Sequence, residues 1–314
     1  METKKLASAG KSSATSAGFR TGRGEASMLI EILGSGGADP APRPGCHCPT
    51  CEVARERGIP YARTGPSTFV HGANILFDTP EETRGQLNRA GIDRVTACFY
   101  SHWHPDHVMG RRVFELLNWD VYGWPPRLHV TDVYLPEQVA VDFEAHLGGA
   151  EHFSYLEQIG VVRVHEVRDG TSVTVEGVTV TPIRLAESYV YAFFVEHAGT
   201  RVLIAPDELV GWSPPAWLEG LDLAVLPMGI CEHDPFTGER KVHEDHPILQ
   251  LEMTFPETIE VVRGLRPTRA VLTHIEEADD PGPDILNQLA AMHQEGSLPI
   301  TFAHDTMRIE VGPA

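Results

Sequence analysis

The segment Ser101-His102-Trp103-His104-Pro105-Asp106-His107 gathers three imidazoles and one carboxylate on a short loop. It directly follows the apolar run Val95-Thr96-Ala97-Cys98-Phe99-Tyr100, which predicts a buried strand. Two histidines separated by one residue can converge on one metal ion, and Asp106 and His107 can face a second ion nearby. A histidine-rich surface loop or a purification tag is the alternative, but neither explains the aspartate or the buried strand. The segment therefore predicts a metal-binding loop at the carboxyl end of a strand.

Composition limits the functions that such a loop can serve. The chain has 314 residues, of which 42% are hydrophobic, so it can bury the core of one compact domain. Its formal net charge of -19 argues against a nucleic-acid partner, because neutralising phosphates requires clustered lysine and arginine. The sequence shows neither a run of about eighteen apolar residues nor a secretion signal. We therefore expect a cytoplasmic protein with no membrane partner.

The N-terminal region divides into a leader and the start of the folded domain. Residues 1–27 are rich in Ala, Ser, Gly, Lys and Arg without an apolar period, which predicts a disordered leader or a sequence added for expression. Residues 28–314 are the predicted catalytic domain, and a strand from Met28 to Leu33 opens it. The following Gly34-Ser35-Gly36-Gly37 indicates either close approach of the backbone to a metal centre or an ordinary turn.

Three of the five cysteines are clustered at residues 46–51. Cys46, Cys48 and Cys51 are too close together for a disulfide framework, and their spacing is typical of three ligands in a tetrahedral zinc site. The fourth ligand must be His47 or a residue elsewhere in the chain. The sequence therefore predicts a structural zinc site, called here a metal knot, in the catalytic domain.

Four ionisable residues follow apolar runs that predict strands: Asp78, Glu187, Asp207 and His274. A side chain at the end of a buried strand is in the position from which a sheet delivers catalytic groups. Asp78 is expected to orient a metal ligand through a hydrogen bond, or else to cap the helix that begins near Pro80.

Four further segments have predicted structures. Residues 67–70 and 74–78 predict a β-hairpin. Residues 161–180 predict a pair of strands of alternating polarity, with turns at Asp169-Gly170 and Glu176-Gly177. Residues 135–147 are a predicted helix. The aromatic, proline-rich residues 116–126 are a predicted loop that walls a pocket.

Taken together, these motifs resemble the metallo-β-lactamase fold hydrolases. The resemblance extends from Met28 to Val311, and Leu76-Phe77-Asp78, Ile204-Ala205-Pro206-Asp207 and Leu272-Thr273-His274-Ile275 follow the family's order. The pairing of an early Cys cluster with the later histidine loop is most similar to the cyclic phosphodiesterases of the carbon-phosphorus lyase pathway. The resemblance implies an α/β fold, an αββα sandwich with two metal ions at one edge of its sheets.

The resemblance also implies a ligand set. His102 and His104 would hold the first ion, Asp106, His107 and His274 would hold the second, and Asp207 would bridge the two. A hydroxide between the ions would be the nucleophile. Asp106 is expected to be a catalytic residue as well as a metal ligand.

The chain departs from the family where a third histidine normally binds the first ion. Glu187 stands in that segment, and as a ligand it would remove about one unit of positive charge from the site. Attraction for a phosphoryl group would weaken. The preferred catalytic ions would also move from zinc toward manganese or iron, which favour oxygen ligands.

A second departure concerns the metal knot. In the family a histidine three residues beyond the last metal-binding histidine completes the Cys site, and Glu277 occupies that position here. Zinc accepts carboxylate oxygens, so Glu277 is the predicted fourth ligand and Glu276 the alternative.

The segment after residue 228 is rich in histidine and resembles the family's substrate-side loop. His243, two residues before Asp245, is the candidate general acid, because an imidazole can protonate an alkoxide near neutral pH. The alternative is that His243 or His246 caps the helix that follows.

These features predict a dinuclear metal-dependent hydrolase that cleaves a small phosphodiester or a related ester. The predicted cofactors are two divalent catalytic ions (zinc, manganese or iron) and one structural zinc. The predicted partner is a small-molecule substrate, and the alternatives for the oligomeric state include a homodimer. The alternative function is a non-haem di-iron oxidative enzyme, because the B protein of pyrroloquinoline quinone biosynthesis shares the fold and the Cys cluster.

Overall fold

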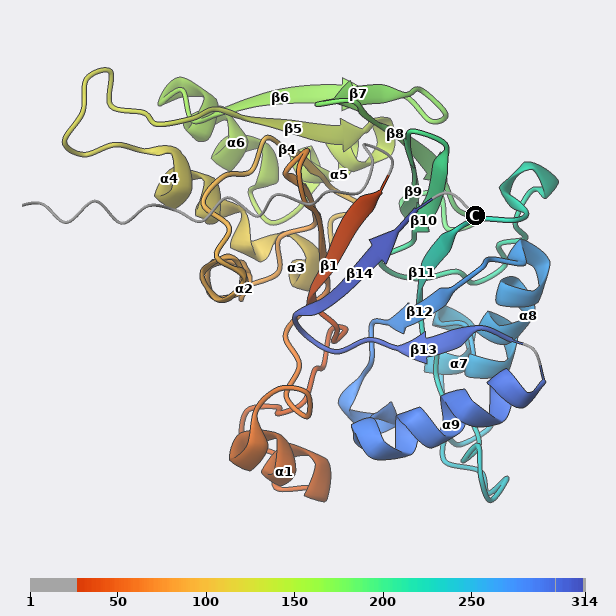
Figure 1. Cartoon of the computed structure of the whole chain (residues 1–314). Coiled ribbons are helices and arrows are strands. Elements are labelled where there is room, and N and C mark those ends of the chain that lie inside the picture. Colours follow the sequence, from red (N-terminus) through yellow and green to blue (C-terminus); the bar gives the residue numbers. More distant parts are fainter. Residues whose placement is uncertain (1–26, 297, 313–314) are drawn as a thin grey trace, which may run out of the picture.

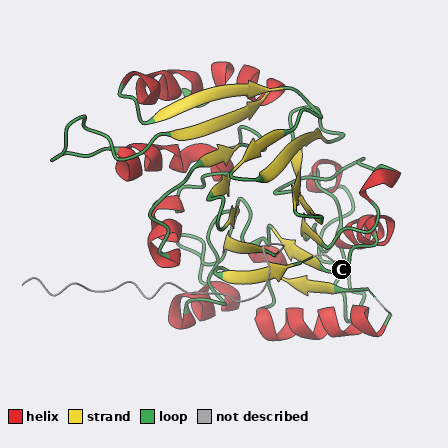
Figure 2. Cartoon of the chain, turned by 45° about the horizontal axis from the view of Figure 1, so that its top comes forward, coloured by secondary structure: helices red, strands yellow, loops and turns green. Residues whose placement is uncertain are grey.

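The computed structural model describes residues 27–296 and 298–312, which form two seven-stranded sheets packed face to face with helices outside them (Figures 1 and 2). The predicted αββα sandwich is therefore confirmed. The predicted leader, residues 1–27, lies outside the described residues except for Ser27. Within the described part of the chain, no helix is long and apolar enough to cross a bilayer.

The first sheet has the strand order β14-β1-β2-β3-β4-β5-β6. Its strands are β1 (Met28–Gly34), β2 (Ser67–Val70), β3 (Ile75–Phe77), β4 (Ala97–Phe99), β5 (Thr131–Pro136), β6 (Val162–Val167) and β14 (Met307–Val311). The strands from β14 to β3 pair antiparallel, and those from β3 to β6 pair parallel. The carboxyl ends of β3 and β4 therefore lie at the same edge.

The second sheet repeats this plan in the order β13-β12-β11-β10-β9-β8-β7. Its strands are β7 (Val173–Val175), β8 (Val178–Arg184), β9 (Tyr191–His197), β10 (Thr200–Ile204), β11 (Leu223–Pro227), β12 (Ala270–Thr273) and β13 (Ile300–Phe302). Strands β7 to β10 pair antiparallel, and β10 to β13 pair parallel. The carboxyl ends of β10 and β12 consequently also share one edge.

Alternating side chains divide the core into layers. In β4, Ala97 and Phe99 point into the cluster between the sheets, whereas Cys98 points into the cluster beneath the helices of the first sheet. In β9, Phe193 and Phe194 divide in the same way between the central cluster and that of the second sheet. This period of two, with both faces buried, explains why the strands read as continuous apolar runs.

Helices cover the outer face of each sheet. Those on the first sheet are α2 (Thr83–Ala90), α4 (Val113–Asn118), α5 (Glu137–Ala145) and α6 (Gly149–Gln158), and α8 (Phe255–Leu265) and α9 (Pro283–Glu295) pack on the second. The short α3 (Pro105–Val108) and α7 (Ile248–Leu251) and the N-terminal α1 (Pro49–Arg57) complete the described α-helices, and three short 3-10 helices lie at Met109–Arg112, Ala216–Leu218 and Glu277–Asp279. Figure 1 shows α1 standing apart from the sheets, near one end of α9.

Several predicted elements are confirmed and others are wrong. The hairpin is present as β2 and β3. The strand pair predicted for residues 161–180 is confirmed in part: β7 and β8 pair antiparallel across the turn at Glu176-Gly177. Strand β6 does not pair with β7, because it is the edge of the first sheet and β7 the edge of the second. The predicted helix at 135–147 begins only at Glu137, after β5 has ended.

The predicted pocket wall at residues 116–126 is also wrong. Its first residues end helix α4, and the loop that follows projects away from the body of the molecule (Figure 1). The side chains of Tyr122 and Trp124 are 100% and 92% exposed, so they pack against nothing in the described chain.

Candidate metal centre

The histidine loop leaves the first sheet at the end of β4. His102 and His107 are fully buried, and His104 is half-buried at the N-cap of α3. Pro105 starts that helix, which turns Asp106 and His107 back toward His102. The ring centroid of His102 lies 4.5 Å from that of His104 and 4.2 Å from that of His107. The loop therefore gathers its imidazoles as the spacing predicts.

His102, His104 and Asp207 form the first group of possible metal ligands. One ligand atom from each lies within 4.8 Å of the others. Asp207 comes from the second sheet, just beyond β10, and its Oδ2 is 3.0 Å from His102 Nε2. The first group thus joins the two sheets.

The second group consists of Asp106, His107 and His274, again with ligand atoms within 4.8 Å of one another. His274 follows β12 with a positive φ of 54°, which turns its ring toward the loop. Asp106 Oδ2 lies 3.2 Å from His107 Nε2 and 3.7 Å from His274 Nε2. Three protein ligands with an open position are typical of a catalytic metal site.

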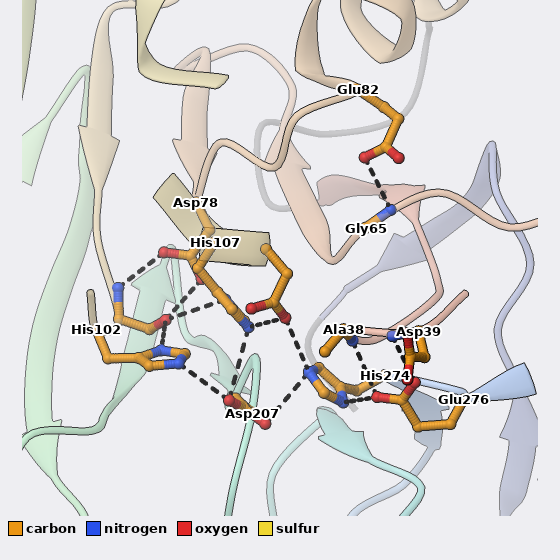
Figure 3. Close-up of polar contacts among 12 residues, drawn as sticks. Ala38, Asp39, Gly65, Asp78, Glu82, His102, His107, Asp207, His274 and Glu276 are labelled. Carbon is orange, nitrogen blue, oxygen red and sulfur yellow. Dashed lines mark hydrogen bonds and ion pairs between the residues drawn. The ribbon is translucent and has the colours of Figure 1, made fainter. Parts of the chain in front are cut away.

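Asp207 lies between the two groups (Figure 3). Its Oδ1 is 3.2 Å from His274 Nε2, and its Oδ2 is 3.6 Å from His107 Nε2 as well as close to His102. One carboxylate therefore faces both groups, which is the geometry that a bridging ligand requires.

Asp78 lies behind the loop, as the sequence predicts. It follows β3 with a φ of 60°, and its buried carboxylate accepts hydrogen bonds from His107 Nδ1 (2.8 Å), Ser101 N (2.8 Å) and Ser101 Oγ (2.7 Å). Ser101 Oγ is in turn 3.0 Å from His102 Nδ1. Because Asp78 holds the proton on Nδ1 of His107, Nε2 of the neutral ring is free to bind a metal.

The electrostatics of the two groups fit divalent cations. The Nε2 atoms of His102, His107 and His274 are buried and have no hydrogen-bond partner, although each faces a carboxylate. Burial lowers the pKa of His274, but Asp207 and Asp106 outweigh it and raise that pKa to about 10. Burial also lowers the pKa of His104 to about 4. The carboxylates thus attract a positive charge at the place where the imidazole lone pairs converge.

A separate group is formed by Cys46, Cys48, Cys51 and Glu277. Glu277 Oε1 lies 2.5 Å from Cys48 Sγ and 3.9 Å from Cys46 Sγ. The structure thus brings Glu277 to the cysteines. Glu276 has another role, because its carboxylate accepts hydrogen bonds from Ala38 N (2.9 Å) and Asp39 N (2.7 Å).

The chain matches a family model described as the beta-lactamase superfamily domain over residues 73–275, nearly two thirds of its length. The chain belongs to the beta-lactamase superfamily. This superfamily binds divalent metals, in agreement with the two groups of ligands.

Matches to curated proteins are partial. An octanoyltransferase of Porphyromonas gingivalis is 34% identical over 93 residues, which is 29% of this chain and 19% of that protein. A ribonuclease Z of Archaeoglobus fulgidus is 30% identical over 128 residues, 39% of this chain and 38% of that protein. The chain therefore spans less than two fifths of either relative.

Solved structures share the superfamily fold over most of the chain. A diphosphatase from the PhnP family has a TM-score of 0.64 at 23% identity and covers 90% of this chain and 97% of its own. Zinc-bound PqqB from Methylobacterium extorquens has a TM-score of 0.61 at 16% identity, covering 90% and 99%. CmlA, a diiron β-hydroxylase from Streptomyces venezuelae, has a TM-score of 0.50 at 16% identity, covering 79% and 53%. At these identities the likeness shows the fold alone.

Glu187, the predicted third ligand of the first group, is not brought into either group. Its side chain is exposed at the corner of the turn between β8 and β9. In that turn Val190 N donates to Glu187 O (3.0 Å) and Leu185 N to Val190 O (2.9 Å), which fixes the corner toward solvent. Glu187 thus belongs to neither group in this structure, and its role as a ligand stays a prediction.

Tyr189, on the same turn, is the residue that sequence reasoning missed. Its half-buried ring has its centroid 5.6 Å from that of His104 and 6.2 Å from that of His102. Burial, with Glu187 and Asp207, raises the pKa of its phenol. Its position two residues beyond Glu187 was the feature of the sequence that could have indicated it. Only the folded turn shows which of the two side chains points toward the histidines.

A cavity of about 600 Å³ is lined by Glu276, whose carboxylate lies 3.7 Å from His274 Nδ1, and by none of the six residues of the two groups. Its wall includes Glu252, Glu276, His243 and His246. His243 is 75% exposed and belongs to neither group of ligands. His246 Nδ1 accepts a hydrogen bond from Ile248 N (3.2 Å), the first residue of α7, so the capping role holds for His246.

The glycine-rich segment approaches the second group closely. A Cβ atom on Gly37 would lie 2.5 Å from His274 Nδ1 and 2.2 Å from Glu276 Oε1. Such distances exclude a side chain, so the backbone there lies against a metal ligand, as one of the two readings of the segment predicted.

Proposed function

We propose that this chain is a dinuclear metal-dependent hydrolase that cleaves a small phosphodiester or a related ester. The observation that carries the proposal is that Asp207, one of the three residues of the first group, also faces the second three-residue group. A lone structural metal would need only one such group. Two adjacent ions are suited to a displacement at phosphorus or at an acyl carbon.

Charge favours an anionic substrate. Two divalent cations together with Asp106 and Asp207 sum to a formal charge of about +2, since Glu187 lies outside both groups. This reverses the weakening of phosphate attraction that a Glu187 ligand would cause. The proposed substrate is therefore a small molecule with a negatively charged phosphoryl group.

The bound ions and the residues around them would have different roles in catalysis. Bound ions would supply an activated water as nucleophile and would polarise the scissile bond. Asp78 holds the His107 ring in place, and Gly37 leaves His274 room against the backbone. Neither residue belongs to a ligand group, so both would act by fixing the geometry of the ligands.

His243 is the proposed general acid. The acid form would be the imidazolium, with a proton on each ring nitrogen, and the Asp245 carboxylate lies 3.9 Å from its Nδ1. The residue lines the same cavity as Glu276. The imidazolium would give its Nε2 proton to the leaving oxygen of a substrate that fills this cavity and would be left as the neutral imidazole.

A small molecule fits better than a nucleic acid. The net charge of -19 opposes a polyanion, and the cavity of about 600 Å³ lies within the range of small-ligand sites. The proposed cofactors are zinc or manganese at the catalytic groups and one zinc at the cysteines.

The test is hydrolysis of bis(p-nitrophenyl) phosphate by protein purified without added metal and then titrated with zinc or manganese. Asp207→Asn should lose one or both catalytic ions and at least about 1,000-fold in rate, because the shared carboxylate holds both groups. Asp93→Asn, which changes an exposed aspartate, is the matched control and should retain both.

Two outcomes would contradict the proposal. One is an Asp207→Asn protein with two ions and normal turnover. The other is a purified protein with two irons, visible absorbance and oxygen consumption, which would assign the oxidative function instead.

A further inference from the structure

The cysteine group carries an unusual fourth member. We call Cys46, Cys48, Cys51 and Glu277 the thiolate site. A divalent ion bound to three thiolates and one carboxylate has a formal charge of about -2, whereas a histidine in place of Glu277 would leave about -1. The carboxylate thus costs electrostatic stability unless a cation lies beside it.

Arg43 is placed to supply that cation. Its Nη2 lies 3.1 Å from Glu277 Oε2, the oxygen that does not contact Cys48. The Glu277 carboxylate is only 11% exposed, so water screens this pair less than it would a surface pair. One carboxylate therefore points one oxygen at the cysteines and the other at a guanidinium.

The backbone of Arg43 is also part of the thiolate site. Its N–H donates to Cys51 Sγ (3.2 Å), and its carbonyl accepts from Cys46 N (3.2 Å). Arg55, on α1, donates from Nη2 to the same carbonyl at 2.7 Å. These contacts fix the main chain of Arg43, so that its side chain starts from a defined position next to Glu277.

We propose that Arg43 is the counter-ion that makes Glu277 a workable fourth ligand. The guanidinium restores the overall charge to about -1, the value of a site with three cysteines and one histidine. It also orients the carboxylate so that Oε1 faces the cysteines. Arg43 is therefore a positioning residue for the metal, and the proposal depends on metal binding at the thiolate site but not on the hydrolase activity.

The contact geometry favours arginine over lysine at this position. A guanidinium presents donors in a planar fork and stays charged when partly buried, whereas an ammonium is a strongly hydrated point charge. Arg43→Lys should therefore recover the charge but not the orientation of Glu277.

The experiment is a double-mutant cycle between Arg43 and Glu277 read by metal affinity. Cobalt replaces zinc in the purified chain, and only the thiolate site gives sulfur-to-cobalt absorption, so it is distinguished from the histidine groups. Cobalt and zinc affinities are then measured by competition with a chelator for wild type, Arg43→Gln, Glu277→His and the double variant.

We expect Arg43→Gln to weaken metal binding at the thiolate site about 10- to 100-fold, the usual effect of removing a partner of a metal ligand. In the Glu277→His background the same change should lower the metal affinity by less than about threefold, because no carboxylate remains to be neutralised. Arg43→Lys should lie between the wild type and Arg43→Gln. Arg57→Gln, which removes a cation that instead contacts Tyr61, is the matched control and should keep wild-type affinity.

An equal loss in both backgrounds would overturn the proposal, since Arg43 would then act without Glu277. So would an unchanged affinity of Arg43→Gln, or a sulfur-to-cobalt band that keeps its full intensity in Cys48→Ser. Circular dichroism at saturating zinc verifies folding, and Arg43→Lys supports the same comparison if Arg43→Gln does not fold.

Discussion

Asp78 shows how one residue can govern a site that it does not enter. Its carboxylate accepts from His107 Nδ1 and from both donors of Ser101, so it fixes the ring of one ligand and the main chain that leads to His102. It is 1% exposed, and its left-handed backbone is a conformation that aspartate tolerates better than most residues. Buried hydrogen bonds of this kind orient metal ligands.

Replacing Asp78 tests this role. Asp78→Asn keeps the volume but removes the charge and one acceptor, so the ring of His107 loses its fixed tautomer. We expect about a 10- to 100-fold loss of catalytic metal affinity, with a parallel loss of activity. Titration of the metal-free variant with zinc measures the change, and affinity within twofold of wild type would show that Asp78 serves stability alone.

The turn between β8 and β9 decides the chemistry on the side of the first group. Its hydrogen bonds send Glu187 outward and leave Tyr189 beside His104 and His102. The side chain next to the first group is thus a phenol and not a carboxylate.

Substitutions on this turn distinguish the role of Glu187 from that of Tyr189. Glu187→Ala should leave metal content and rates within about twofold of wild type, because the side chain is exposed. Tyr189→Phe should reduce kcat/KM about 3- to 10-fold at unchanged metal content, the value of one lost hydrogen bond to substrate. Loss of a catalytic ion from Glu187→Ala would restore Glu187 as a ligand, and loss of one from Tyr189→Phe would make the phenol a ligand.

At the scale of the whole molecule, the metal groups join two sheets. His102, His104, Asp106 and His107 leave the first sheet after β4, whereas Asp207 and His274 leave the second after β10 and β12. Ions held between them would tie the sheets together at one edge. Ligands that bind only the folded state stabilise it by mass action.

Chelation should therefore destabilise the chain. Free ion at about 100 times its Kd contributes about 2.7 kcal/mol, so removal should lower Tm by roughly 5–10 °C. Calorimetry with and without EDTA measures the shift. Most of it should remain in Cys48→Ser, which lacks the thiolate site, and a shift that disappears in that variant would assign the stabilisation to the cysteines alone.

The sequence by itself determined the parts that covalent spacing fixes. The histidine loop, the cysteine triad, the β2–β3 hairpin and the strand-end position of Asp78 are short-range features, because residues a few positions apart on one turn have few ways to be arranged. The αββα fold was implied by the resemblance of these motifs to a known family, and the strand ends pointed to Asp207 and His274.

Only the tertiary structure decided how distant residues meet. Strands β6 and β7 are neighbours in sequence yet close different sheets, since burial of both faces of each sheet overrides local pairing. Packing likewise placed Glu277 rather than Glu276 at the cysteines, and Tyr189 rather than Glu187 beside His104. The direction of a side chain at a turn depends on backbone angles and long-range contacts, which spacing along the chain does not specify.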